Sequence, residues 1–197
     1  MYVRIADFSQ CTNDELASAL EKLSQQGAES IVLDLRNNPG GLLTAVVDVA
    51  SQFLNKDEII LYEVDSKGER KAYRANREGL ARDVPLAVLV NKYTASASEV
   101  LAGALRAHHR GPLIGITTYG KGSICTIRQL QDSSALQLTT ARWLTPDEEQ
   151  IEGRGLVPDI EVEMTEEARQ RGEDPQLQAA INYLKGRATR GRILPLP

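Results

Sequence analysis

The chain has 197 residues, of which 42% are hydrophobic and 25% charged, as in a globular domain with a substantial core. Its formal net charge is −4 with both signs mixed, so it lacks the basic stripe with which nucleic-acid-binding proteins neutralise phosphates. Cys11 and Cys125 lie too far apart for a metal knuckle or a dense disulfide framework. No apolar run approaches the roughly 20 residues that cross a bilayer. We therefore expect no nucleic-acid partner and no metal site built on these cysteines.

Strands alternate with helices in the predicted first part of the chain. A strand over residues 2–5 precedes residues 12–26, where apolar residues at i, i+3, i+4 and i+7 indicate a helix. The apolar run at residues 31–35 is typical of a strand buried on both faces. After a turn at residues 36–41, an apolar stripe predicts a second helix over residues 42–54.

The alternation continues in the second part. Residues 59–64 and 70–73 are predicted strands, residues 74–83 an exposed loop, residues 86–90 a buried strand and residues 97–109 a helix. Three further strands are expected at residues 113–115, 123–130 and 135–143, and a closing helix at residues 174–186. The pattern predicts an α/β fold with crossover helices.

We expect one domain, residues 1–186, followed by a flexible tail over residues 187–197. This tail is first basic and then apolar. A first strand that begins at Met1 also suggests that the sequence was cut from a longer precursor.

Three turns carry residues suited to chemistry, and the first is residues 36–41. Gly40 and Gly41 leave main-chain N–H groups unobstructed ahead of a helix, where they could bind an oxyanion. The alternative is a tight strand-to-helix connection in which glycine supplies a positive φ.

The second turn holds Ser96 at the junction of a buried strand and its helix. Its hydroxyl would lie at the positive end of the helix dipole, beside unpaired N–H groups that could stabilise a tetrahedral intermediate. Ser96 and Glu99 also have capping-box spacing, so an ordinary N-cap serine is the alternative.

The third turn holds Lys121 between Gly120 and Gly122. A lysine buried in an apolar cleft would have a lowered pKa, and its neutral amine could accept a serine proton. The alternative is a solvated lysine in a flexible hairpin.

The spacing of the histidines argues against a histidine base for Ser96. His108 and His109 lie at the far end of the same predicted helix, and twelve residues put His108 about 18 Å from Ser96 along its axis. His108 continues the apolar stripe and should be partly buried, whereas His109 should be solvated.

Taken together and in order, the three turns resemble the carboxy-terminal processing, or tail-specific, protease family. The matching segments are residues 33–41 (LDLRNNPGG), 94–99 (TASASE) and 120–123 (GKGS). Further similar positions are residues 138–143, Pro146 and residues 153–162, so the resemblance runs from about residue 2 to residue 162.

The resemblance implies a fold like that of the ClpP and crotonase superfamily, a spiral of ββα units with a mixed sheet. It also implies a serine endopeptidase with a Ser-Lys dyad that cleaves proteins near their carboxyl ends without a metal or cofactor. Ser96 would be the nucleophile and Lys121 its base, and Ala97 with Gly40 or Gly41 would donate N–H groups to the oxyanion.

Two departures from the family pattern stand out. Cys125 occupies the position where relatives usually have a glutamine that positions the lysine, and a thiol is a poor hydrogen-bond partner. Most relatives have a peptide-binding PDZ-type domain that precedes or interrupts the core, and we expect none within these 197 residues.

Family analogy further implies a protein or peptide substrate with an apolar carboxyl end. It also implies a periplasmic or extracytoplasmic location, allows a membrane-associated parent, and leaves a homo-oligomer open. Two alternatives remain: a ligand- or peptide-binding module without catalysis, and a crotonase-like acyl-CoA enzyme.

Overall fold

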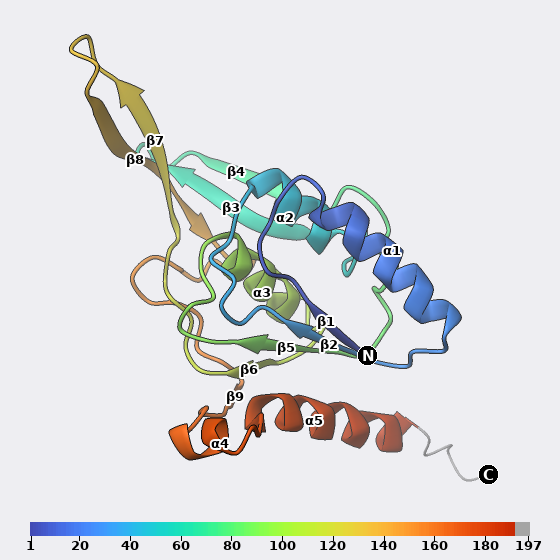
Figure 1. The fold of residues 1–197 in the computed structure, drawn as a ribbon. Coiled ribbons are helices and arrows are strands. Elements are labelled where there is room, and N and C mark those ends of the chain that lie inside the picture. The colour runs from blue at the N-terminus through green and yellow to red at the C-terminus, as the bar shows by residue number, and fades with distance from the viewer. Residues whose placement is uncertain (192–197) are drawn as a thin grey trace.

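The computed structural model describes residues 1–191 of the chain (Figure 1). Within that range the order is β1 (Tyr2–Arg4), α1 (Thr12–Gln25), β2 (Ile31–Asp34), α2 (Leu43–Ala50), β3 (Ile59–Asp65), β4 (Arg70–Arg74), β5 (Leu86–Val90), α3 (Ala97–Ala107), β6 (Leu113–Gly115), β7 (Ser123–Gln129), β8 (Ala135–Leu144), β9 (Ile160–Glu161), α4 (Glu166–Gln170) and α5 (Pro175–Gly191).

The strands form two separate sheets. In the first, all neighbours are parallel in the order β1-β2-β5-β6-β9, and in the second all are antiparallel in the order β4-β3-β8-β7. The predicted α/β fold with crossover helices is confirmed, with its parallel and antiparallel strands divided between the two sheets.

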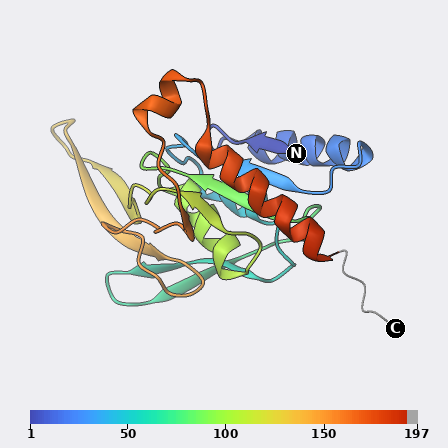
Figure 2. The ribbon, with the colours of Figure 1, turned by 90° about the horizontal axis from the view of Figure 1, so that it is seen from below.

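The central parallel strands are apolar because both of their faces are covered. Val32 and Leu89 face α5, where they pack with Ala180 and Leu184. Leu33 and its neighbours on the opposite face pack against the other helices. The layers are therefore α5, the parallel sheet, helices α1 to α3, and the antiparallel sheet, as Figure 1 shows. Figure 2, seen from below, shows α5 crossing over the parallel strands.

The predicted elements differ from the observed ones mainly at their ends. Helix α2 ends at Ala50 because the next turn tightens, with Gln52 N donating to Val49 O and Phe53 N to Ala50 O, both at 3.0 Å. Short elements β9 and α4 were not expected. Helix α5 runs to Gly191, and the part of the predicted tail from residue 192 onward lies outside the described residues.

Helix α3 is the buried centre of the molecule, and small residues allow its close packing. A Cβ added to Gly103 would lie 2.8 Å from Thr145 Cγ2. Its N-terminus faces the carboxyl ends of β2, β5 and β6, where the three candidate turns of the sequence leave the sheet. Such edges are where α/β folds bind ligands.

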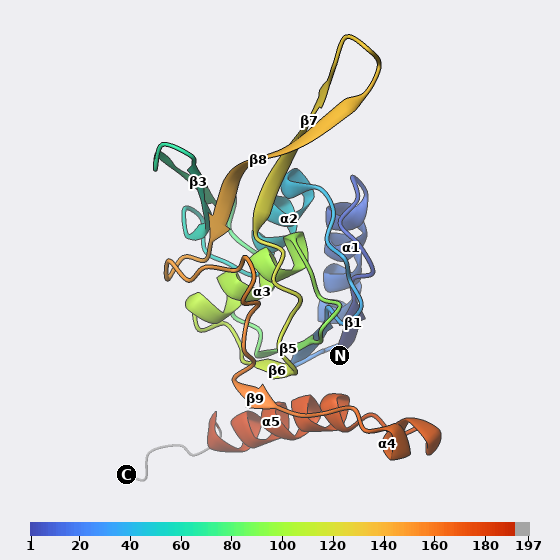
Figure 3. The ribbon, with the colours of Figure 1, turned by 90° about the vertical axis from the view of Figure 1, so that its left-hand side faces the viewer.

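The β7–β8 hairpin extends away from these layers (Figure 3). It begins two residues after Lys121, so the third candidate turn lies at its base. Within residues 1–191, no helix combines the length and apolar character needed to cross a bilayer.

Replacing Leu89 by alanine should lower the free energy of unfolding by about 2–5 kcal/mol, because the side chain is 0% exposed and leaves a cavity between β5 and α5. Denaturant unfolding measures this loss. Leu80→Ala is the matched control: Leu80 is 55% exposed, so its loss should stay within about 0.5 kcal/mol. Equal losses in both variants would contradict this packing.

Candidate functional site

Ser96 occupies a sharp turn between β5 and α3. Its φ of 58° and ψ of −121° are unusual for a residue with a side chain, and such strain is typical of functional turns. Neighbouring hydrogen bonds hold the turn: Ala95 N donates to Asn38 O at 3.0 Å, and Val100 N donates to Ser96 O at 3.1 Å. Ser96 itself is half-buried. An ordinary N-cap residue has β-region backbone angles, so helix capping alone does not account for the positive φ of Ser96.

The turn at residues 36–41 lies directly against Ser96. A Cβ added to Gly40, whose φ is 101°, would stand 2.7 Å from Ser96 Cβ and 2.9 Å from Ala97 N. Only glycine fits this approach. The Ser98 hydroxyl also donates to Asn38 O at 3.1 Å. The structure therefore brings together the first two candidate turns.

The main-chain N–H groups of the two glycines differ in their partners. Gly40 N donates to Asn38 Oδ1 at 2.9 Å. In contrast, Gly41 N and Ala97 N donate to no acceptor among the described residues. Ala97 is the first residue of α3, and Gly41 ends the 36–41 turn, where an added Cβ would lie 2.2 Å from Phe8 O. Gly41 and Ala97 thus carry the two N–H groups of these turns that have no acceptor in the described part of the chain.

Glu99 connects the Ser96 turn to the Lys121 turn. Its carboxylate is fully buried, and Oε2 accepts hydrogen bonds from Ser96 N at 2.9 Å and Lys121 N at 2.8 Å. Oε1 accepts from Gly120 N at 2.7 Å and from the Thr118 hydroxyl at 2.5 Å. Because the main-chain nitrogens of Ser96 and Lys121 donate to the same oxygen, the distance between them cannot exceed the sum of these two hydrogen-bond lengths.

A second carboxylate and a main-chain bond hold the rest of the Lys121 turn. Gly122 N donates to Glu152 Oε2 at 2.7 Å, and Gly153 N donates to Gly120 O at 2.9 Å. Hydrogen bonds to Glu99 and to residues 152–153 thus hold the backbone of this turn, which is not a flexible hairpin. The Lys121 residue is exposed, so the structure does not place it in an apolar cleft.

Cys125 lies on β7 and is exposed with a free thiol. Its Sγ is 3.8 Å from Thr139 Oγ1, and no hydrogen bond joins it to Lys121 in the described part of the chain. The predictions for the histidines are confirmed. His108 is partly buried at the C-terminal end of α3, with Nε2 2.7 Å from Ile59 O, and His109 is exposed.

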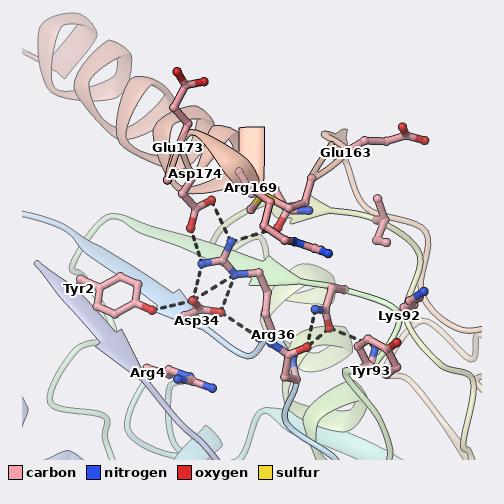
Figure 4. Close-up of a pocket in the computed structure, with 16 residues that line it drawn as sticks. Tyr2, Arg4, Asp34, Arg36, Lys92, Tyr93, Glu163, Arg169, Glu173 and Asp174 are labelled. Carbon is pink, nitrogen blue, oxygen red and sulfur yellow. Dashed lines mark hydrogen bonds and ion pairs between the residues drawn. The ribbon is translucent and has the colours of Figure 1, made fainter. Parts of the chain in front are cut away.

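A cavity of about 640 Å³ lies beside these turns, at the carboxyl ends of β1, β2, β5 and β6 (Figure 4). Arg36 in its wall binds two carboxylates, Asp34 at 2.7 Å and Asp174 at 2.8 Å. Burial alone would lower the pKa of Arg36, but hydrogen bonds to both carboxylates raise it above its ordinary value. Burial alone would raise the pKa of Asp174, but the bonds from Arg36 and from Leu177 N lower it.

Two contacts of this region could not be predicted from local sequence patterns. The spacing of Ser96 and Glu99 indicated a capping box, but not that Glu99 also binds the Lys121 turn 21 to 22 residues away. Asp174 lies 138 residues from Arg36, and no local pattern signals their contact. Among residues 1–191, no three His, Cys, Asp or Glu side chains gather as a metal site.

Comparison with known proteins yields consistent matches. The sequence model of "Peptidase family S41" matches residues 1–162. The "Carboxyl-terminal-processing protease" of Synechocystis sp. is 43% identical over 193 residues, covering 94% of this chain and 44% of that protein. The "Carboxy-terminal processing protease CtpA" of Bacillus subtilis is 37% identical over 184 residues, covering 93% of this chain and 38% of that protein.

A solved structure of "Photosystem II D1 C-terminal processing protease" matches with a TM-score of 0.78 and 42% identity, covering 82% of this chain and 42% of that one. The chain thus spans less than half the length of each of these relatives.

Glu99→Gln should lower the free energy of unfolding by about 1–3 kcal/mol. The glutamine amide replaces one accepting oxygen by an NH₂ group, which leaves buried donors such as Ser96 N or the Thr118 hydroxyl without an acceptor. The matched control is Glu163→Gln, an exposed site where the change should stay within about 0.5 kcal/mol. Urea unfolding of both variants measures the difference. A Glu99→Gln protein as stable as the unmutated one would refute the described bonding of this carboxylate.

Proposed function

Because this chain belongs to peptidase family S41, we propose that it is the catalytic core of a serine endopeptidase that cleaves proteins near their carboxyl ends. Ser96 is the nucleophile and Lys121 the general base of this proposal. The observation that carries it is the Glu99 carboxylate oxygen shared by the main chains of these two residues. A cap alone would not require the second bond.

The proposed reaction begins with attack of Ser96 Oγ on the scissile carbonyl carbon. The neutral Lys121 amine takes the hydroxyl proton as the O–C bond forms, and the carbonyl electron pair moves onto the oxygen. The N–H groups of Ala97 and Gly41 would bind this oxyanion. When the tetrahedral intermediate collapses, the C–N bond breaks and Lys121 returns the proton to the leaving amine. Water then hydrolyses the acyl-enzyme by the same route.

The position of Ala97 supports the oxyanion role. It is the first residue of α3, where the N–H has no intrahelical partner and the helix dipole is positive. Gly40 would support the oxyanion site without donating to the oxyanion itself. Its N–H bonds to the Asn38 side chain, and its lack of a side chain lets Ser96 pack against the turn.

Two exposed tyrosines support binding of an apolar chain end. Tyr93 precedes the Ser96 turn and is 57% exposed, and Tyr119 precedes Lys121 and is 66% exposed. The turns are joined here, with Tyr119 N donating to Thr94 O at 3.0 Å. Aromatic side chains beside a reactive group provide contact area for apolar substrate residues. We also propose an extracytoplasmic location and a role for residue 125 in lysine alignment, both from the family resemblance.

Ser96→Ala and Lys121→Ala should each lower the rate of hydrolysis of an unfolded protein, and of a peptide with an apolar carboxyl end, by about 1000-fold or more, since each removes one half of the dyad. Purified chain and product analysis by mass spectrometry measure this loss. His109→Ala changes an exposed residue just beyond the C-terminal end of α3, and this control variant should retain the full rate.

Cleavage that persists in Ser96→Ala would contradict the proposal. Cys125→Gln adds a directional check: if residue 125 helps to align the amine, glutamine should raise kcat in the Lys121 protein. It should have no effect in the Lys121→Ala background.

A further inference from the structure

The donors of Arg36 are fully used. Nε bonds to both oxygens of Asp34 at 3.0 and 3.1 Å, and Nη2 bonds to Asp34 Oδ2 at 2.7 Å and to Asp174 Oδ2 at 2.8 Å. Nη1 bonds to Asp174 Oδ1 at 2.9 Å and to Gln176 Oε1 at 3.1 Å. The guanidinium has only five N–H groups, so Arg36 has little capacity left for a ligand in the neighbouring cavity. Its role is to join segments of the chain.

Asp174 provides a fixed partner at the far end of this network. Its Oδ1 also accepts from Leu177 N at 2.9 Å at the start of α5, and α5 is anchored to the parallel sheet through Ala180 and Leu184. Asp174 lies beyond residues 1–162, the part matched by the family model. Figure 4 shows its carboxylate directed at Arg36, while Glu173 points away.

Separate hydrogen bonds hold the successive residues of the turn that begins at Arg36 and faces Ser96. Arg36 N donates to Asp34 Oδ1 at 2.9 Å, and Asn37 N donates to Asn91 Oδ1 at 3.0 Å. The Asn38 side chain then donates to Ile5 O at 2.9 Å and accepts from Gly40 N. Each residue of the turn from Arg36 to Gly40, apart from the proline, is thus tied at its backbone or side chain.

We propose that Asp174 is a positioning residue: through Arg36 it holds the 36–41 turn, and with it the Gly41 N–H, in register with Ser96. The bidentate contact between Asp174 and Arg36 fixes the side chain of Arg36, because a planar guanidinium held by two carboxylates has one orientation. The consequence for catalysis rests on the proposed function, whereas the positioning of the turn does not.

Loss of the Asp174 charge should loosen the turn without unfolding α5. Asparagine is as good an N-cap as aspartate, so the bond from Leu177 N is retained in Asp174→Asn. The amide would instead direct its own N–H₂ at the Arg36 donors and leave part of the guanidinium without an acceptor. The matched control is Glu173→Gln, since Glu173 binds Arg171 and not Arg36.

Hydrogen–deuterium exchange of peptides covering residues 36–42 tests the positioning itself. Exchange should be about tenfold or more faster in Asp174→Asn than in the unmutated chain, and unchanged in Glu173→Gln, because protection reports local opening. Equal exchange in all three proteins would overturn the proposal, even if the thermal stability of Asp174→Asn were lower.

Kinetics test the catalytic consequence in the same proteins. Asp174→Asn should lower kcat about 10- to 100-fold with KM within about threefold, as a displaced N–H acts on the transition state more than on substrate binding. In an Arg36→Lys background Asp174→Asn should have little further effect on kcat, since Asp174 is proposed to hold the turn through Arg36. An unchanged kcat would overturn the catalytic part. If the unmutated chain showed no Ser96-dependent hydrolysis, the proposed function would fail, and the exchange result would still decide whether Asp174 holds the turn.

Discussion

The Glu99 carboxylate, buried at the first turn of α3, accepts four hydrogen bonds from two segments of the chain. A buried charge without partners would be strongly unfavourable, so these donors and the carboxylate fix one another in place. One of its oxygens binds the main chains of both Ser96 and Lys121. The geometry of the proposed dyad therefore depends on this one side chain. The free-energy cost of burying the Glu99 charge is offset only while the Ser96 and Lys121 turns both donate hydrogen bonds to it.

The rest of the fold presents these turns to Glu99. β2 and β5 pair in register, so the turns that follow them leave the sheet side by side, and the absence of a side chain at Gly40 lets them touch at Ser96. Ser96 is the N-cap of helix α3, and Glu99 lies in the first turn of the same helix. Helix α5 approaches from the opposite face of the sheet and reaches the 36–41 turn through Asp174 and Arg36. Two carboxylates thus bind these turns: Glu99 binds the Ser96 and Lys121 turns from the core, and Asp174 binds Arg36 at the start of the 36–41 turn.

Features governed by local pattern were predictable from the sequence. The strands at residues 31–35 and 86–90 are apolar apart from Asp34 because both faces are covered, and the observed β2 and β5 confirm them. The end of α2 was missed because Phe53 and Leu54 continue its apolar stripe from a turn, where they are equally buried. β9 has only two residues and α4 only five, too few for a periodic signal. The contacts of Glu99 with residues 118–121, and of Arg36 with Asp174, join distant segments and follow only from the folded arrangement.

The pH dependence of kcat/KM for peptide hydrolysis tests the central claim, that Lys121 serves Ser96 as base, most directly. Only a neutral amine accepts the serine proton, so the account predicts a rate that rises steadily with pH between about 6 and 10. Lys121→Arg, which stays charged over this range, should be nearly inactive throughout. A flat profile for the unmutated chain over the same range would contradict Lys121 as the base.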